Sequence, residues 1–311
     1  MYPFNHPQPV MRNQEFSMTS TLSRRDLFKG MALTAGAIAL IRAGLTPDIA
    51  GAQQGDMPPG TVHSFAKGGV TFHTYVSPAP AVHVTSHVIE LGDQLLLVDA
   101  TMLPPTAAEV AALVAATGKP VHTALISHEH PDHWAGVATM EGVSFATLPQ
   151  VREGLRAEAT AGEWPEPTSL LDGPDITPGM TEIGGVPVEF RHYENTEAPH
   201  MLVVVLPEQR VAVVQDLVYN GVYFAPGSDR QNWIATLEML RDDPAFDTLL
   251  VGHGLPTTRG DLDTAIAYLR VFDQAWADGE TPADVIAAMK TAYPGYGGEF
   301  LLGLIEAYWD K

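Results

Sequence analysis

Four side chains of types that can bind divalent cations lie within six residues of one another. The segment from residue 127 reads Ser-His-Glu-His-Pro-Asp-His, and its ligand-type residues are His128, His130, Asp132 and His133. Buried together without a partner, these groups would repel one another when charged and would leave polar atoms unsatisfied. The His-x-His spacing lets two imidazoles bind one ion, and Asp132 with His133 can bind a second. The segment therefore predicts a metal centre.

The elements around this segment are suited to hold it in place. Residues 121–127 are apolar and β-branched, which is typical of a buried strand that ends at the histidines. Residues 134–140 predict a turn into a short helix. We therefore expect the metal ligands on a short loop between a strand and a helix.

This combination of motif and context resembles the metallo-β-lactamase-fold hydrolase superfamily, in which His-x-His-x-Asp-His follows a strand. The resemblance extends from about residue 70 to residue 260. It implies an αββα four-layer sandwich of the α/β (α+β) class, with extra C-terminal helices at about 258–311. It also implies two divalent metal ions, with zinc favoured and iron or manganese as alternatives.

The pattern along the chain agrees with two sheets packed face to face and helices outside. We expect strands at 70–77, 83–90, 94–98, 121–127, 143–148 and 246–251, and hairpins over 180–193 and 201–216. We expect helices at 104–117, 149–160, 232–241, 261–277, 281–292 and 299–309. Residues 163–174 predict a proline-rich loop over a pocket.

Two further ligands are expected at the ends of later strands. Asp216 ends the apolar segment 211–216, where a buried carboxylate without a cation would be unfavourable. The resemblance implies that Asp216 bridges the two ions. His253 lies between two glycines and matches the last ligand position of the superfamily. Asp99, at the end of 95–99, is expected to hold a ligand imidazole in the correct tautomer.

The remaining ligand position departs from the pattern of the superfamily. Most members have Gly-His-Thr-x-Gly there, whereas residues 195–201 read Asn-Thr-Glu-Ala-Pro-His-Met. Counting back from the turn at Pro207 places Glu197 at the histidine's position, and His200 follows three residues later. Glu197 is favoured, because this stretch is similar to the alkylsulfatase branch, where a glutamate replaces the histidine. His200 stays a rival, and six further histidines are expected to be surface or satisfied core residues: His63, His73, His83, His87, His122 and His192.

The chemistry implied by this resemblance is hydrolysis. Two ions lower the pKa of a bridging water, so that hydroxide is present near neutral pH. Asp132 would orient this nucleophile and pass a proton to the leaving group. Tyr219 lies three residues after Asp216, where N-acyl-homoserine lactonases have a tyrosine that contacts the substrate carbonyl. The resemblance at this offset favours a carboxylic ester or lactone as the substrate.

Three alternatives stay open. An alkylsulfatase-like hydrolase fits residues 196–199, but the chain has no evident arginine cluster for sulfate. A β-lactam hydrolase fits the fold without a specific signal. A non-catalytic periplasmic metal-binding module would keep the site and lack the reaction. Four aromatic residues are expected as walls of an apolar pocket: Trp134, Trp164, Tyr223 and Phe224.

Composition excludes several classes of partner. The 311 residues contain no cysteine, so every metal ligand must be nitrogen or oxygen. The formal charge of −20 disfavours binding to nucleic acid and to anionic membranes. The same charge counts mildly against anionic substrates. The oligomeric state is not predicted.

The first 52 residues resemble a twin-arginine export signal. Residues 23–29 read Ser-Arg-Arg-Asp-Leu-Phe-Lys, an apolar stretch covers 31–41, and Ala-Gly-Ala at 50–52 matches a signal-peptidase site. The apolar stretch is too short to span a membrane comfortably. We expect the twin-arginine export machinery as a partner and a periplasmic or secreted hydrolase domain, residues 53–311, without stable membrane association after cleavage.

Overall fold

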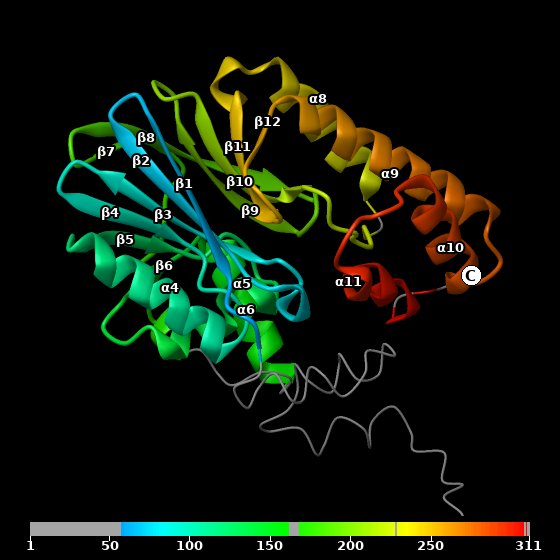
Figure 1. The fold of residues 1–311 in the computed structure, drawn as a ribbon, viewed down its shortest axis with the longest axis horizontal. Coiled ribbons are helices and arrows are strands. Elements are labelled where there is room, and N and C mark those ends of the chain that lie inside the picture. Colours follow the sequence, from blue (N-terminus) through cyan, green and yellow to red (C-terminus); the bar gives the residue numbers. More distant parts are fainter. Residues whose placement is uncertain (1–56, 162–167, 228, 308, 310–311) are drawn as a thin grey trace, which may run out of the picture. The chain divides into compact units, whose positions relative to one another are not determined.

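The structure is a computed structural model that describes residues 57–161, 168–227, 229–307 and 309 (Figure 1). The expected export signal and Trp164 lie outside the described residues. Within the described part of the chain, none of the helices combines the length and the apolar character that a membrane span requires.

Two six-stranded sheets form the centre of the fold. The first sheet has the order β1-β2-β3-β4-β5-β6, with bounds Thr61–Lys67, Val70–Val76, Thr85–Leu91, Gln94–Val98, Val121–Leu125 and Phe145–Ala146. The second has the order β12-β11-β10-β9-β8-β7, and β7 to β12 span Gly179–Ile183, Val186–Glu194, His200–Leu206, Val211–Tyr219, Thr248–His253 and Thr257–Thr258. The pairs β4–β5, β5–β6 and β10–β11 are parallel, and the others are antiparallel.

Helices cover the outer faces of both sheets. The α-helices α4 to α11 span Pro104–Thr117, Pro131–Trp134, Pro149–Ala161, Thr168–Leu171, Arg230–Asp242, Gly260–Asp278, Pro282–Ala292 and Glu299–Gly303. The 3-10 helices η2 to η5 span Ala79–Ala81, Ala135–Thr139, Pro244–Phe246 and Leu304–Ala307. Figure 1 shows α4 outside the first sheet and α8 and α9 outside the second. The predicted αββα sandwich with extra C-terminal helices is confirmed.

The central strands of the second sheet, β9, β10 and β11, are buried on both faces. Strand β9 has six consecutive buried residues, from Met201 to Leu206, because alternate side chains enter two different apolar clusters. Leu202 and Val204 pack in the cluster that includes the first sheet, whereas Val203 and Val205 pack with the residues of α8 and α9. This layered core fixes the ends of the central strands, where the polar residues of the site lie.

Several element boundaries differ from those expected. Strand β1 was not predicted, because it is an edge strand with mostly exposed residues and no apolar alternation. The strand expected over 143–148 is reduced to Phe145–Ala146. The expected loop 163–174 contains the short helix α7, and the last expected helix is divided into α11 and η5.

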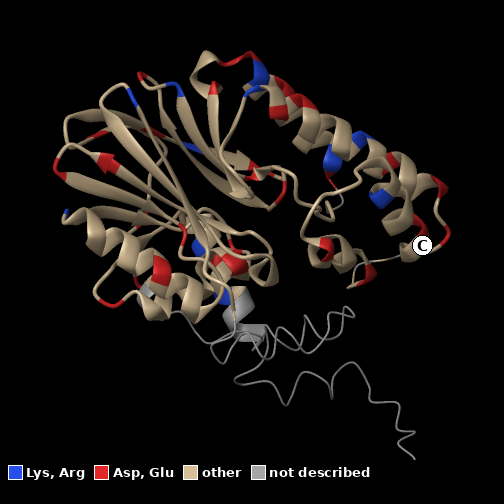
Figure 2. Cartoon of the chain, viewed as in Figure 1, with Lys and Arg blue, Asp and Glu red and all other residues tan. Residues whose placement is uncertain are grey.

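Acidic residues are spread over the sheets and helices of the described chain, with fewer basic residues between them (Figure 2). Their distribution agrees with the strongly negative composition of the sequence.

Candidate metal centre

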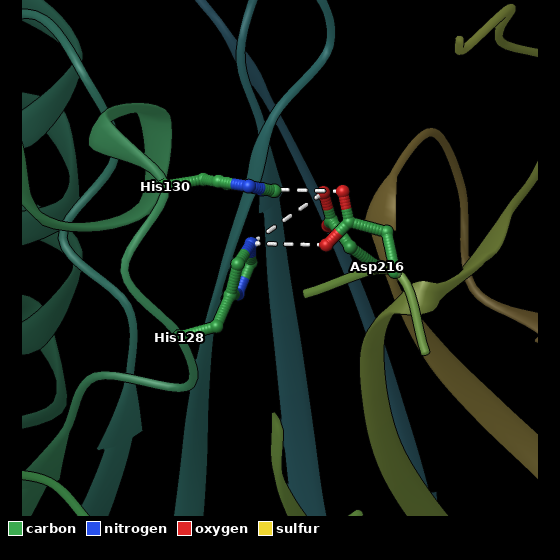
Figure 3. Close-up of side chains that lie close together, drawn as sticks. His128, His130 and Asp216 are labelled. Atoms are coloured by element: carbon green, nitrogen blue, oxygen red, sulfur yellow. Dashed lines mark ion pairs between the residues drawn. The ribbon is translucent and has the colours of Figure 1, made fainter. Parts of the chain in front are cut away.

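Strands from both sheets end at a cluster of histidines and carboxylates. The loop after β5 carries His128 and His130, and Asp216 lies on β10 of the other sheet. Figure 3 shows His128, His130 and Asp216 close together, with the imidazole of His128 facing the Asp216 carboxylate. Leu202 of β9 donates its backbone N–H to the Ser127 carbonyl, at 2.8 Å, which ties the loop to the second sheet.

The first group of ligand-type residues consists of His128, His130, Glu197 and Asp216, whose nearest donor atoms all lie within 4.8 Å of one another. His128 Nε2 is 3.6 Å from Glu197 Oε2 and 3.8 Å from Asp216 Oδ2. His130 Nδ1 is 3.1 Å from Glu197 Oε1. Glu197, not a histidine, thus completes this group.

The second group consists of Asp132, His133, Asp216 and His253. His133 Nε2 is 3.1 Å from Asp216 Oδ1 and 3.7 Å from Asp132 Oδ2. His253 Nε2 is 3.2 Å from Asp132 Oδ2 and 3.4 Å from Asp216 Oδ2. Asp216 belongs to both groups, so its two oxygens lie where a bridging ligand would be needed.

Five of the donor atoms in these groups are buried and have no hydrogen-bond partner. The unpartnered atoms include His128 Nε2, His133 Nε2, His253 Nε2, Glu197 Oε2 and Asp216 Oδ1. Burying so many polar atoms without partners is strongly unfavourable. Two ligands of one tetrahedral zinc ion lie roughly 3.3 Å apart. The spacing and the missing partners therefore both fit a pair of divalent cations.

Charges in the centre shift the pKa values of its histidines in opposite directions. Burial alone would lower the pKa of His130, but the Glu197 carboxylate outweighs burial and raises it to about 10. His253 behaves likewise, and the pKa rises to about 9 because of Asp216 and Asp132. Burial and the neighbouring His133 hold the pKa of His128 well below its ordinary value. Protons on His130 and His253 thus balance the carboxylates when no cation does.

Asp99 at the end of β4 holds His133 in a fixed orientation. Its Oδ2 accepts a hydrogen bond from His133 Nδ1, at 2.7 Å. Ser127 donates to the same carboxylate through its backbone N–H and its hydroxyl, at 2.8 and 2.7 Å. With Nδ1 donating to Asp99, Nε2 of His133 is left to face the cluster. His253 is oriented similarly, since its Nδ1 lies 2.8 Å from the carbonyl oxygen of Val82.

Gln215 supports the centre and was not predicted from the sequence. Its amide nitrogen donates to Asp99, and its amide oxygen lies 2.9 Å from His87 Nε2. His87 is fully buried and also contacts Thr74 and Thr85, so it is a satisfied core histidine as predicted. The sequence does contain a signal for this role, because Gln215 is a polar residue inside an apolar strand and directly precedes Asp216.

A bulge in β10 and a glycine in β11 position Asp216. The register with β11 shifts on both sides of Gln215, whose φ of 44° lies in the left-handed region. On β11, a Cβ added to Gly252 would lie 1.7 Å from Asp216 Oδ1. Only glycine therefore leaves room for the carboxylate in this position.

Tyr219 lies against the same carboxylates. Its hydroxyl donates to Asp216 Oδ2 at 2.6 Å and is 3.5 Å from Glu197 Oε1. Its ring stacks on His253 and on Phe224, with centroid distances of 4.9 and 4.2 Å. Burial, reinforced by Asp216 and Glu197, raises the pKa of Tyr219 well above its ordinary value. The phenol therefore stays protonated and acts as a hydrogen-bond donor.

His200 lies outside both groups. Its Nδ1 is 3.1 Å from His192 Nε2 and 3.6 Å from Glu194 Oε1, at the start of β9. Only three residues separate His200 from Glu197, yet the turn between β8 and β9 directs Glu197 into the metal centre. Of the two rivals, Glu197 is the one that the structure brings to the other ligand-type residues.

The three expected aromatic walls that lie within the described residues are part of the core. Trp134 is 1% exposed and donates to the Glu129 carbonyl. Tyr223 and Phe224 are buried as well, in the cluster of the second sheet and the C-terminal helices. Phe224 nevertheless contacts the candidate centre indirectly, because its ring stacks on that of Tyr219.

Comparison with known proteins concerns the family and the fold. The sequence profile described as the metallo-beta-lactamase superfamily matches residues 79–253, which is more than half of the chain. No curated protein matches the chain by sequence.

Solved structures share the fold at low sequence identity. A metallo-beta-lactamase from Pontibacter korlensis superposes with a TM-score of 0.55 and 21% identity, covering 68% of this chain and 99% of its own. One from Hirschia baltica gives 0.52 and 18%, covering 68% and 97%. The metallo-beta-lactamase FIM-1 from Pseudomonas aeruginosa in a mono-zinc form gives 0.52 and 19%, covering 70% and 97%. These similarities concern the fold.

Proposed function

The chain belongs to the metallo-β-lactamase superfamily, and on this basis we propose that it is a binuclear metal-dependent hydrolase of carboxylic esters or lactones. The observation that carries the proposal is the pair of donor groups that share Asp216, with buried atoms that have no hydrogen-bond partner. Such an arrangement is unfavourable in a protein that binds no cation.

Each donor group would hold one ion. His128, His130 and Glu197 would bind the first, while Asp132, His133 and His253 would bind the second, with Asp216 between them. Two bound divalent cations would supply Lewis acidity and would lower the pKa of a bound water. Zinc is the first choice for so many imidazoles, and the carboxylate of Glu197 keeps iron and manganese as alternatives.

Asp132 is the carboxylate best placed to handle a proton. Its side chain is 16% exposed, whereas Asp216 is almost fully buried. Burial opposes ionisation of Asp132, but His133 and His253 outweigh burial and lower its pKa. An ionised Asp132 would accept a hydrogen bond from the attacking water and carry its proton to the leaving group.

Tyr219 supports a carbonyl substrate. A protonated phenol beside Asp216 and Glu197 would donate to the oxygen that gains charge when an ester or lactone carbonyl is attacked. During that step its hydrogen bond would move from the Asp216 carboxylate to the substrate oxygen. The aromatic stack on His253 and Phe224 keeps the phenol in this place.

A β-lactam is the second candidate substrate. It is favoured by the names of the superposed structures, which are metallo-beta-lactamases. A β-lactam also has a carbonyl group that is attacked during hydrolysis. Asp132 and Tyr219 would therefore have the same roles in a β-lactam hydrolase as in an ester or lactone hydrolase.

The test is a pH-stat assay of the protein from Gln53 onward, with bound metal quantified in the same sample. The panel contains aliphatic lactones, carboxylic esters, a β-lactam and a long-chain alkyl sulfate, each of which releases acid when hydrolysed. We expect turnover of lactones or esters, lost in Asp216→Asn and kept in the control Asp93→Asn, which changes an exposed carboxylate.

The other outcomes separate the alternatives. Turnover of the β-lactam or of the alkyl sulfate alone would replace the proposed substrate by that one. Two bound metals without acid from any substrate would favour the non-catalytic metal-binding module.

A further inference from the structure

A second cluster of ligand-type residues lies where β8 and β9 meet. His192, Glu194 and His200 bring one donor atom each within 4.8 Å of one another. His192 Nε2 is 3.1 Å from His200 Nδ1, and that nitrogen is 3.6 Å from Glu194 Oε1. Two nitrogens bound to one tetrahedral zinc ion lie roughly 3.3 Å apart. The spacing in this cluster is therefore already that of ligands around one ion.

The strand register places all three side chains on one face of the sheet. Glu194 pairs with His200, and His192 pairs with Leu202, in the antiparallel ladder of β8 and β9. His192 and Glu194 are two residues apart on β8 and so point to the same side. His200 lies directly opposite Glu194 and points to that side as well.

The backbone around the cluster is well connected. Across the turn, Asn195 N–H donates to the Pro199 carbonyl at 2.9 Å, and Thr196 N–H donates to the Ala198 carbonyl at 3.1 Å. The side chain of Asn232 on α8 donates to the Glu194 carbonyl at 2.9 Å. The strand ends that carry the three donors are thus held in place before any ligand binds, which favours binding.

We propose that His192, Glu194 and His200 form a third divalent cation site, separate from the binuclear centre. Two imidazoles and one carboxylate suit zinc and related transition metals. Half-buried histidines and an exposed glutamate leave coordination positions to water, so the site binds more weakly and exchanges faster than the binuclear centre.

A cation bound at this site would affect the turn 195–199. The turn 195–199 joins the two strands and carries Glu197 into the binuclear centre. A cation bound by both strands at the base of this turn would restrain their separation. The third site would thereby stabilise the segment that presents Glu197, without contact with a substrate.

The alternative is that the two imidazoles make a hydrogen bond to each other and bind nothing. The experiment that separates these cases is a Zn²⁺ titration of the metal-free protein, from Gln53 onward, against a chromophoric chelator. We expect three zinc equivalents for the wild type, of which the third is bound most weakly. His192→Gln and His200→Gln should each bind two, while the control His122→Gln, an exposed histidine on β5, should bind three.

Two further measurements keep the result independent of the binuclear centre and of misfolding. Asp216→Asn should lose zinc from the binuclear centre and keep the weak equivalent, whatever its activity. Thermal unfolding should show the third equivalent raising the Tm of the wild type, but not of His192→Gln or His200→Gln. Only two equivalents in the wild type, or a third that persists in both glutamine variants, would refute the third site.

Discussion

At the scale of single residues, the centre depends on carboxylates that satisfy several partners at once. Asp216 faces both donor groups, and Asp99 accepts hydrogen bonds from His133, Ser127 and Gln215. A carboxylate has two oxygens that only accept hydrogen bonds, whereas an amide of the same shape has one acceptor and one donor. Replacing aspartate by asparagine therefore tests these roles with little change in volume.

Asp99→Asn should weaken metal binding by about 10–100-fold, because His133 loses the partner that sets its tautomer and orientation. Equilibrium dialysis against buffered Zn²⁺ measures this affinity. The surface control Asp93→Asn should leave it unchanged. Equal affinity of Asp99→Asn and the wild type would contradict the role of Asp99.

Tyr219→Phe should reduce kcat for an ester or lactone by about 10²–10³-fold, because the donor to the developing oxyanion is lost. The ring stack on His253 and Phe224 is kept, so bound metal should stay at the wild-type level. Steady-state kinetics with metal analysis of the same sample checks this. A variant with normal kcat would show that the phenol only positions Asp216.

Metal uptake should become tighter as pH rises toward 9. In the metal-free protein, carboxylates hold the pKa of His130 at about 10 and that of His253 at about 9, so both imidazoles are protonated at pH 7. Metal binds neutral imidazole, so binding must displace these protons. Calorimetric titration in two buffers of different ionisation enthalpy measures the protons released, and no release at pH 7 would contradict the expectation.

At the scale of elements, two irregularities in regular strands create the position of Asp216. The bulge around Gln215 directs the carboxylate toward the histidine loop, and β11 approaches it closely at Gly252. A bulge re-orients the side chains that follow it. Regular pairing of β10 and β11 would therefore not point the Asp216 carboxylate toward the histidine loop. The parallel β10–β11 pair also ends at His253, which brings the last imidazole to the same edge.

Gly252→Ala should disrupt the centre, because the added Cβ would lie 1.7 Å from Asp216 Oδ1 and the carboxylate must move. We expect loss of bound metal together with a destabilisation of about 1–3 kcal/mol. Metal analysis and chemical denaturation measure the two effects. Gly303→Ala is the matched control, since its Cβ would meet nothing within 4 Å; unchanged metal content in Gly252→Ala would refute the steric argument.

At the scale of the whole molecule, the C-terminal helices are joined to the site through aromatic contacts. Tyr219 stacks on Phe224, and Phe224 stacks on Tyr268 of α9 with a centroid distance of 4.2 Å. The Tyr268 hydroxyl also donates to the Phe224 carbonyl at 2.7 Å. These helices follow the part of the chain that matches the superfamily profile, yet they support one of its catalytic candidates.

Export from the cytoplasm by the twin-arginine route is a proposal at the same scale. Arg24→Lys combined with Arg25→Lys should retain the full-length protein in the cytoplasm, because twin-arginine signals require the arginine pair. Cell fractionation and determination of the mature N-terminus measure this, with Gln53 expected as the first residue. Arg12→Lys serves as the control, and normal export of the double variant would contradict the proposed route.

The sequence by itself determined what depends on residues close together in the chain. A short loop after a strand can bring closely spaced side chains to one place. The sequence therefore predicted one cluster of His128, His130, Asp132 and His133. The apolar runs that became β9 and β10 predicted buried strands for the same local reason. These local patterns agreed with two packed sheets, and the resemblance to the superfamily that the motif carries implied the fold class, which the structure and the superfamily profile confirm.

Only the tertiary structure decided the contacts between distant segments. Glu197 and His200 are three residues apart, and the hairpin turn, with Asn195 at a φ of 51°, determines which of them faces His130. The link from His87 through Gln215 to Asp99 joins three strands, and edge strand β1 is stabilised by its pairing with β2 rather than by its own apolar pattern. Such contacts depend on the packing of the two sheets, which local periodicity does not encode.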